Sequence, residues 1–285
     1  MRPGTALHSR ATLFMLGGVA MLVLNDTAAK WLLARYDPVQ IAFLRSVLAM
    51  PILVVVVWIS GGRAAFRSHS PGMHSVRGML VLLATLAFFG SLRALSLAEA
   101  TSLLFTAPII VVVIAALFLK ERVGPRSRAS VLLGFAGVLI ILRPGLEAFR
   151  PESLQALLAA LLYAFIMISA RWIDARDSLW TMTFHMTLST GLFSTVGLFR
   201  PWPGMTGEDL GLFALMAVLG TGGAACISQA FRLAPANLIA PLDYTALLWA
   251  SVAGWLVWGV VPGWPVYAGA AVIIVSGVVL MRARG

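Results

Sequence analysis

The sequence predicts an all-α integral membrane protein with about ten transmembrane helices. Hydrophobic residues make up 60% of its 285 residues and charged residues only 11%, whereas soluble domains average about 25% charged residues. The apolar residues gather in runs of roughly twenty, the length that a helix needs to cross a bilayer. So few polar residues could not cover the surface of a soluble domain of this length, which excludes a soluble globular fold.

The ten expected spans follow one another through short linkers that are rich in Arg, Pro and Gly. The linkers leave no room for a separate soluble domain, and the first span is expected to be a retained helix rather than a signal peptide. The fifth and tenth spans are short, so we expect them to be untilted or flanked by snorkelling arginines. The spans are Ala11–Leu33, Pro38–Ser60, Gly78–Ala94, Leu97–Leu119, Ala129–Leu142, Ser153–Trp172, Leu179–Phe199, Leu210–Phe231, Pro235–Trp258 and Pro265–Met281.

The distribution of basic residues predicts that both termini are cytoplasmic. The net charge is +10, but the basic residues lie in short loops and form no continuous stripe, so nucleic acid is not an expected partner. With a cytoplasmic N-terminus, fourteen cations fall inside and five outside, as the positive-inside rule requires. The inside set is Arg2, Arg10, Arg63, Arg67, Arg77, Lys120, Arg122, Arg126, Arg128, Arg171, Arg176, Arg232, Arg282 and Arg284; the outside set is Arg35, Arg93, Arg143, Arg150 and Arg200; Lys30 and Arg45 lie within the membrane.

The two halves of the chain resemble each other. The stretch ALSLAEA at 94–100 recurs as AFRLAPA at 230–236, and AGVL at 136–139 matches SGVV at 276–279. Two matches in the same order indicate an internal repeat, with a first five-helix unit at 1–147 and a second at 148–285. Each unit holds an odd number of spans, so the second copy is expected to be inverted, an arrangement typical of secondary transporters.

Several short motifs occur in a fixed order along the chain. They are Asn25-Asp26 with Lys30, Pro38-Val39-Gln40-Ile41 with Arg45, Arg77-Gly78, Leu97-Ala98-Glu99-Ala100, Phe105-Thr106-Ala107-Pro108, Leu119-Lys120-Glu121-Arg122, Gly134-Phe135-Ala136-Gly137-Val138, Arg143-Pro144, and Pro241-Leu242-Asp243-Tyr244-Thr245 with Trp249-Ala250. Together these motifs resemble the EamA-type branch of the drug/metabolite transporter superfamily over nearly the whole length of the chain. One departure is Trp258-Gly259-Val260-Val261, which stands where that family usually ends a helix with Gly-Glu or Lys-Glu.

This resemblance implies two five-helix halves around a central cavity in the bacterial inner membrane, with no cofactor and no ATPase subunit. The main expectation is a secondary transporter, not an enzyme, that exports amino acids by alternating access. The alternatives are a carrier or importer of a nucleotide-derived or vitamin-like solute and, in a different class, an intramembrane enzyme. The expected partners are a small-molecule substrate and the lipid bilayer, and the chain could be a monomer or a homodimer.

Three ionisable residues in the first two spans are candidate site residues. Asp26 and Lys30 are four residues apart on one helix, a spacing that favours an ion pair. Arg45 enters the next helix from the same side, at a depth similar to that of Lys30, about 10 Å. A cluster of the three would either clamp the two helices together or form a gate or substrate site with a residual positive charge suited to an anionic group.

Asp243 is expected near the middle of the bilayer, about 16 Å deep. Pro241 precedes it, and Pro108 interrupts the corresponding span of the first half. Interrupted helices in matching places of two halves indicate a transport site, although both prolines could instead serve helix packing. Asp243 would then recognise substrate or a cation, or donate a hydrogen bond to a neighbouring helix.

The remaining candidates are aromatic residues and one histidine. Five aromatic residues could line a cavity for an amphipathic solute or could face lipid and fill helix contacts; they are Phe88, Phe105, Tyr163, Tyr244 and Trp249. His185 could relay a proton or bridge two helices by a hydrogen bond. His69 and His74 have no further metal ligand nearby in sequence, so no metal site is expected.

Overall fold

The computed structural model describes residues 3–118, 124–143, 150–169, 172–174, 176–233 and 240–283. Helices account for nearly all of them, and these residues contain no β-strand. A helix lies in each of the ten ranges expected from the sequence. The elements are α1 (Pro3–Leu32), α2 (Pro38–Gly61), η1 (Gly62–Phe66), α3 (Pro71–Ser91), α4 (Leu97–Leu104), α5 (Ala107–Phe118), α6 (Pro125–Leu142), α7 (Ser153–Ser169), α8 (Leu179–Phe193), η3 (Ser194–Phe199), α9 (Gly207–Leu233), η4 (Ala240–Thr245), α11 (Ala246–Trp258) and α12 (Trp264–Ala283).

Five helical segments of the described chain are long and apolar enough to cross a membrane by length and composition. Three further apolar helices of the described chain are shorter, at Val131–Leu142, Ser153–Ser169 and Trp264–Val279. The chain is therefore a multi-pass membrane protein. The five segments are Arg10–Leu32, Pro38–Phe66, Pro71–Ser91, Leu97–Ile114 and Gly207–Phe231.

Two of the expected spans are broken in the middle. The fourth ends its first helix at Leu104 and starts again at Ala107, where Pro108 fits the first turn because that turn needs no amide hydrogen from it. In the ninth, the described residues form the 3-10 helix η4 from Ala240 to Thr245 and continue as α11 from Ala246. The breaks occupy matching places in the two halves, and Phe105 at one packs edge-on against Tyr244 at the other, with ring centroids 5.0 Å apart.

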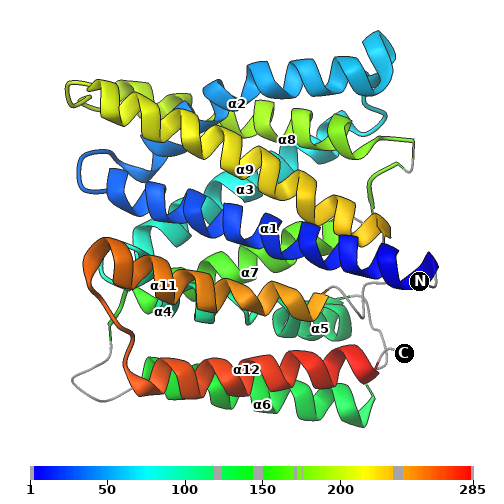
Figure 1. The fold of residues 1–285 in the computed structure, drawn as a ribbon, viewed down its shortest axis with the longest axis vertical. Helices are drawn as coiled ribbons and strands as arrows, with labels where there is room; N and C mark the ends of the chain where they lie inside the picture. The colour runs from blue at the N-terminus through cyan, green and yellow to red at the C-terminus, as the bar shows by residue number, and fades with distance from the viewer. Residues whose placement is uncertain are drawn as a thin grey trace.

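The helices form two layers, with both ends of the chain at the same end of the bundle (Figure 1). In Figure 1, α9, α1, α11 and α12 lie in front of α3, α7, α4 and α6. The most extensive contacts join α1 to α9, α6 to α12, α3 to α7 and α2 to α8. The pairs α2–α8 and α6–α12 lie at opposite edges of the bundle, so the remaining helices form its middle.

Small residues bring the paired helices close together. A Cβ atom built on Gly18 of α1 would lie 2.9 Å from the carbonyl oxygen of Gly223 on α9. One built on Gly137 of α6 would lie 2.8 Å from the carbonyl oxygen of Gly269 on α12. Neither contact leaves room for a larger residue, and close backbone approach of this kind is a usual source of helix association in membranes.

A buried carboxylate joins two loops at the end of the bundle that carries the termini. Asp177, just before α8, accepts hydrogen bonds from the Ser68 hydroxyl at 2.8 Å and the His69 amide at 2.8 Å, and lies 2.9 Å from Nε2 of His74. Burial raises the pKa of the Asp177 carboxyl, but these hydrogen bonds outweigh it and hold that pKa well below its usual range. The cluster fixes the start of α8 against α3.

A second polar cluster fixes the opposite end of the bundle. Asp209 in the first turn of α9 accepts hydrogen bonds from Arg35 at 2.6 Å and from the Tyr36 hydroxyl at 3.0 Å. Nearby, Asp37 pairs with Arg93 at 3.0 Å and with Arg200 at 3.1 Å. The hydrogen bond from Arg93, helped by Arg200, lowers the pKa of Asp37 despite its partial burial. These contacts hold the ends of α1, α2 and α9 together.

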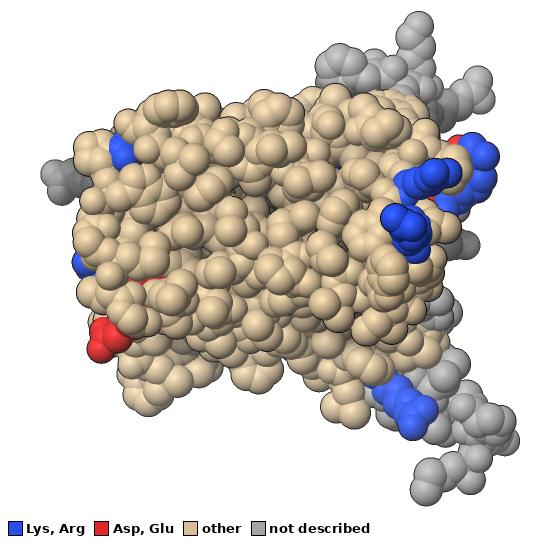
Figure 2. Space-filling view, turned by 90° about the horizontal axis from the view of Figure 1, so that it is seen from above, with Lys and Arg blue, Asp and Glu red and all other residues tan. Residues whose placement is uncertain are grey.

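The surface has the charge distribution of a membrane protein. Figure 2 shows a broad middle band without Lys, Arg, Asp or Glu on the face in view, and charged side chains at its two ends. On this face the blue Lys and Arg side chains gather mainly at one end, which is the end of the termini in Figure 1. An uncharged middle band is what contact with lipid tails requires.

Candidate functional site

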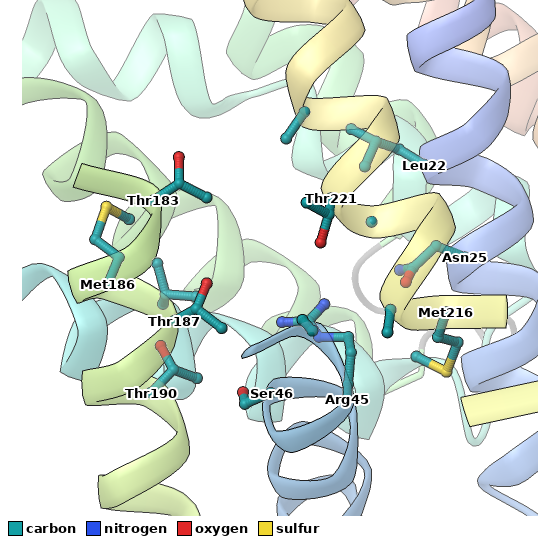
Figure 3. A pocket seen from close by; sticks show the side chains of 15 residues that line it. Leu22, Asn25, Arg45, Ser46, Thr183, Met186, Thr187, Thr190, Met216 and Thr221 are labelled. Carbon is teal, nitrogen blue, oxygen red and sulfur yellow. The ribbon is translucent and has the colours of Figure 1, made fainter. Parts of the chain in front are cut away.

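A cavity of about 280 Å³ lies among α1, α2, α3, α8 and α9, away from both ends of these helices. Figure 3 shows polar side chains converging on it from α1, α2, α8 and α9. Its wall is formed by Leu22 and Asn25 of α1, Arg45, Ser46 and Ala49 of α2, Val81 of α3, Thr183, Met186, Thr187 and Thr190 of α8, and Met216, Ala217, Gly220, Thr221 and Ala224 of α9.

Arg45 is the strongest hydrogen-bond donor of this cavity. It lies seven residues after the start of α2 at Pro38, a distance of about 10 Å along the helix. Its guanidinium group points from α2 into the space between α8 and the pair α1–α9 (Figure 3). It forms no hydrogen bond or ion pair with any residue that the structure describes. A partly buried guanidinium has five N–H donors, so it is available to bind acceptor atoms of a solute.

The hydroxyl groups of three threonines on α8 line the opposite wall. Thr183, Thr187 and Thr190 are spaced four and three residues apart, so they share one helix face. Thr183 donates to the Leu179 carbonyl at 2.9 Å and Thr190 to the Gly78 carbonyl at 3.0 Å. Thr187 has no hydrogen-bond partner within the described part of the chain, and its hydroxyl group is free for a solute.

Asn25 belongs to the α1 side of the wall, and Asp26 follows it on α1 without lining the cavity. The Asn25 side-chain amide donates to Asp26 Oδ1 at 3.0 Å. The buried Asn25 Oδ1 has no hydrogen-bond partner among the described residues, which is unusual for a buried polar atom. Asp26 is close enough to Arg45 for their charges to attract each other, although the two groups are not in contact.

The prediction that Asp26, Lys30 and Arg45 form one cluster is wrong for Lys30. Lys30 donates instead to the Leu95 carbonyl, and its ammonium group lies 5.4 Å from the ring centroid of Trp258. The spacing on α1 allows an Asp26–Lys30 pair, but the long lysine side chain finds a carbonyl and an aromatic face outside α1. Only Asp26 and Arg45 remain together, so the expected surplus of positive charge at this place is absent when Asp26 is ionised.

A second, smaller cavity of about 220 Å³ lies among α4, α6, α7 and α12, close to Leu95. Its charged lining residues are Glu99, Arg143 and Arg150. Glu99 already accepts a hydrogen bond from the Ser96 amide at 2.7 Å, and Arg150 donates to the Ala94 carbonyl. Glu99 and Arg150 therefore help to fix the connection before α4.

The candidate aromatic residues do not line the Arg45 cavity. Phe88 of α3 is buried beside Phe89, at a ring distance of 6.3 Å. Phe105 and Tyr244 face each other at the two helix breaks, and Pro108 lies in the first turn of α5, the second segment of the broken fourth span. These residues therefore mark the middle of the bundle between α4 and α11, which is a different place from the Arg45 cavity.

Asp243, Tyr163 and Trp249 form the third group of candidates. Asp243 lies in η4 and is exposed, as are Tyr163 on α7 and Trp249 on α11. Tyr163 is near enough to Asp243 and Arg77 to feel the charges of both. Asp243 forms no ion pair or hydrogen bond with a residue in the described ranges. It lies at a helix break and lines neither of the two cavities described above.

His185 lies at the end of the bundle that carries the termini. Its Nε2 is 3.1 Å from the Phe66 carbonyl oxygen, and its ring stacks on that of His74 at 5.7 Å. Both neighbours belong to the connection that includes η1 and the start of α3. This arrangement matches the expected hydrogen-bonded bridge, and it places His185 near the Asp177 cluster rather than in the Arg45 cavity.

Sequence reasoning missed the neutral polar residues of the cavity wall. Asn25, Thr187 and Thr221 carry no charge, and single threonines in apolar helices are common because they can bond to their own backbone. The detectable signal was the spacing of Thr183, Thr187 and Thr190, which repeats on one face of a helix. That Thr221 and Arg45 face this stripe depends on packing between distant helices.

The fold and this cavity define a class of protein: a multi-pass membrane protein with a polar, solute-sized cavity between its helix layers. Membrane proteins place polar groups in such positions where a solute or ion passes. The chain belongs to the EamA-like transporter family, whose model matches it twice, at residues 9–143 and 151–282. It is thus an EamA-type member of the drug/metabolite transporter superfamily.

The chain is similar to named bacterial transporters over most of its length. It is 30% identical to the riboflavin transporter of Rhizobium johnstonii, over 94% of this chain and 89% of the relative. It is 26% identical to the S-adenosylmethionine uptake transporter of Rickettsia bellii, over 88% and 86%, respectively. It is 27% identical to the riboflavin transporter of Vibrio cholerae, over 94% and 91%.

One solved structure shows the same fold. This crystal structure of a protein at 21% identity superposes with a TM-score of 0.62 and covers 97% of this chain and 99% of the other. The names of the family and its relatives point to a transporter rather than to the intramembrane enzyme considered above. They give no support to amino-acid export and favour the alternative of a vitamin-like or nucleotide-derived solute.

Proposed function

We propose that this protein is a secondary transporter that carries a vitamin-like or nucleotide-derived solute across the bacterial inner membrane. The observation that carries the proposal is the Arg45 cavity, in which donors without a partner among the described residues meet between the two helix layers. Arg45 and Thr187 lie about 10 and 12 Å along α2 and α8 from opposite ends of the bundle. A solute bound there is far from both membrane surfaces, as alternating access requires.

Ten spans in two inverted repeats, divided at 1–147 and 148–285, are the architecture that we propose for this transport. The double match of the family model supports the repeat. The helix contacts support the inversion. The first span of the first half, α1, packs on the third span of the second half, α9, and the third span of the first half, α3, packs on the first span of the second half, α7. The matching breaks at Phe105 and at Thr245 support it as well.

The relatives and the cavity wall support this solute class. Riboflavin and S-adenosylmethionine both carry a heterocycle with several hydrogen-bond acceptors, and relatives are named for transporting them. The guanidinium of Arg45 and the hydroxyls of Thr187 and Thr221 offer donors to such acceptors. Met186 and Met216 add adaptable apolar contacts for a ring system.

Transport assays with purified protein in proteoliposomes test this function. Vesicles preloaded with one unlabelled solute receive the same solute in labelled form, in separate experiments with riboflavin, S-adenosylmethionine and a set of amino acids. We expect counterflow with one of the two heterocyclic solutes and none in empty vesicles. Counterflow with amino acids alone would contradict the proposed solute class and return amino-acid export as the function.

Orientation in the membrane is part of the proposal, with both termini cytoplasmic. The excess of basic residues at the end of the termini supports it. In a Cys226→Ala background, Gly204→Cys in the loop before α9 should react with an impermeant thiol reagent added to intact cells. Arg63→Cys in η1 should react only after the cells are opened. The reverse pattern would overturn this orientation.

A further inference from the structure

The wall of the Arg45 cavity is electrically balanced when Asp26 is ionised. Arg45 contributes one positive charge, and Asp26 is the charged residue that acts on it within the described chain. Lys30, which would have added a second positive charge, is turned away to the Leu95 carbonyl and Trp258. A solute that enters the cavity therefore meets strong donors without a net positive field.

The balance matters because a bare guanidinium is a good receptor for phosphate and carboxylate groups. Here the negative charge of Asp26 is held in place by the Asn25 amide at 3.0 Å, beside the cavity wall. An anionic group on Arg45 would lie near this carboxylate in surroundings of low polarity, where like charges repel strongly. A neutral acceptor such as a ring carbonyl gains the donors of Arg45 without that repulsion.

We propose that Asp26 determines the specificity of the cavity for neutral, carbonyl-rich solutes by excluding their phosphorylated or otherwise anionic forms. This inference rests on the proposed function and deepens it, because it assigns the substrate charge and the residue that selects it. Asp26 does not line the cavity itself; it acts through Arg45 as a counter-charge. Its role is thus separate from that of the donors that touch the solute.

The free polar groups of the wall fit the same class of solute. Arg45 and Thr187 present donors, while the buried Asn25 Oδ1 is an acceptor without a partner in the described chain. A heterocycle that has carbonyl groups beside a ring N–H offers acceptors and a donor on one edge. Such a heterocycle could satisfy both kinds of group. A phosphate group, which is mainly a dianion at physiological pH, offers acceptors but no donor.

The experiment compares the binding of riboflavin and riboflavin 5′-phosphate to purified protein in nanodiscs. The measured quantity is the dissociation constant of riboflavin 5′-phosphate divided by that of riboflavin, both read from flavin fluorescence. Wild-type protein should bind riboflavin more tightly than the phosphate. Asp26→Asn keeps the shape and the contact with Asn25 but removes the charge, so this ratio should fall by about tenfold or more. Glu208→Gln removes one charge at the exposed start of α9 and should leave the ratio unchanged.

Arg45→Gln provides a second variant, should Asp26→Asn fail to fold. It leaves the negative charge of Asp26 without the positive charge of Arg45. The ratio of the dissociation constant of the phosphate to that of riboflavin should therefore increase, while riboflavin itself binds more weakly. An unchanged ratio in a folded Asp26→Asn protein, or equal binding of both flavins by the wild type, would overturn the role of Asp26 while leaving transport intact. If the wild type binds neither flavin but binds S-adenosylmethionine, the neutral solute class and this inference both fail, although transport of a nucleotide-derived solute stands.

Discussion

Thr183, Thr187 and Thr190 lie on one face of α8, but their hydroxyl groups have different partners. Thr190 joins α8 to α3 through the Gly78 carbonyl at 3.0 Å, and Thr183 bonds to its own helix. Thr187 has no partner among the described residues and faces the cavity (Figure 3). At the scale of single residues, a structural and a solute-binding role can therefore be separated on the same helix.

Substitution of these threonines by valine should separate the two roles. Thr187→Val removes a donor from the cavity, so we expect the KM for the transported solute to rise about fivefold at unchanged thermal stability. Thr190→Val removes the bond to α3 and should lower the melting temperature measured in detergent. Equal transport by Thr187→Val and wild-type protein would show that this hydroxyl does not touch the solute.

A prediction for Asp243 also belongs to the scale of one residue. It is exposed at the η4 break and has no ion pair in the described chain, so we expect its carboxylate to take part in substrate or cation recognition. Asp243→Asn keeps the size and most of the hydrogen bonding but cannot ionise. We predict folded protein whose uptake is reduced, or no longer varies with pH. Wild-type uptake with an unchanged pH profile would refute the functional role.

The sequence predicted most of the elements, because apolar runs determine where helices cross a membrane. The breaks near Pro108 and Pro241 were also foreseeable from the prolines. The prediction for Lys30 was wrong because it used only the spacing of Asp26 and Lys30 on α1. Lys30 instead contacts the Leu95 carbonyl and the Trp258 ring, which lie on other elements and far away in sequence. The change from α8 to the 3-10 helix η3 at Ser194 could not be predicted, because no residue pattern in the sequence marks it.

At the scale of elements, the Asp177 cluster should stabilise the start of α8. Asp177→Asn disturbs hydrogen bonds from Ser68, His69 and His74, so it should cost about 2 kcal/mol and lower the melting temperature. Asp174→Asn, in the same loop, removes only an exposed ion pair with Arg176 and should change the melting temperature little. Equal melting temperatures for the two variants would contradict a stabilising role of the cluster.

The pH dependence of this effect has a definite sign. Because the pKa of Asp177 is lowered in the folded state, its stabilisation is present above the unfolded-state value of about 3.9 and is lost as the pH falls through the folded-state value. The difference in melting temperature between wild type and Asp177→Asn should persist down to about pH 4 and narrow below it. A difference that grows on acidification would contradict this account.

For the whole molecule, the cavity results from packing that no single segment encodes. Gly18 and Gly223 bring α1 against α9, while Gly78 of α3 packs closely on α8. These contacts place Thr221 and Asn25 opposite the α8 threonines, with Arg45 between them. Arg45 and Asp26 could be identified from the sequence as charges within apolar runs, whereas their neutral partners required the arrangement of five helices.

Protection of a cysteine in the cavity wall by solute tests the central claim most directly. Ala224 lines the cavity and is exposed to it, so Ala224→Cys in a Cys226→Ala background supplies a single thiol there. Gly204→Cys in the loop before α9 supplies a control thiol. The account predicts that a saturating transported solute slows alkylation of Ala224→Cys several-fold and leaves Gly204→Cys unaffected. If the solute is transported but both thiols react at the same rates with and without it, the Arg45 cavity is not the transport site.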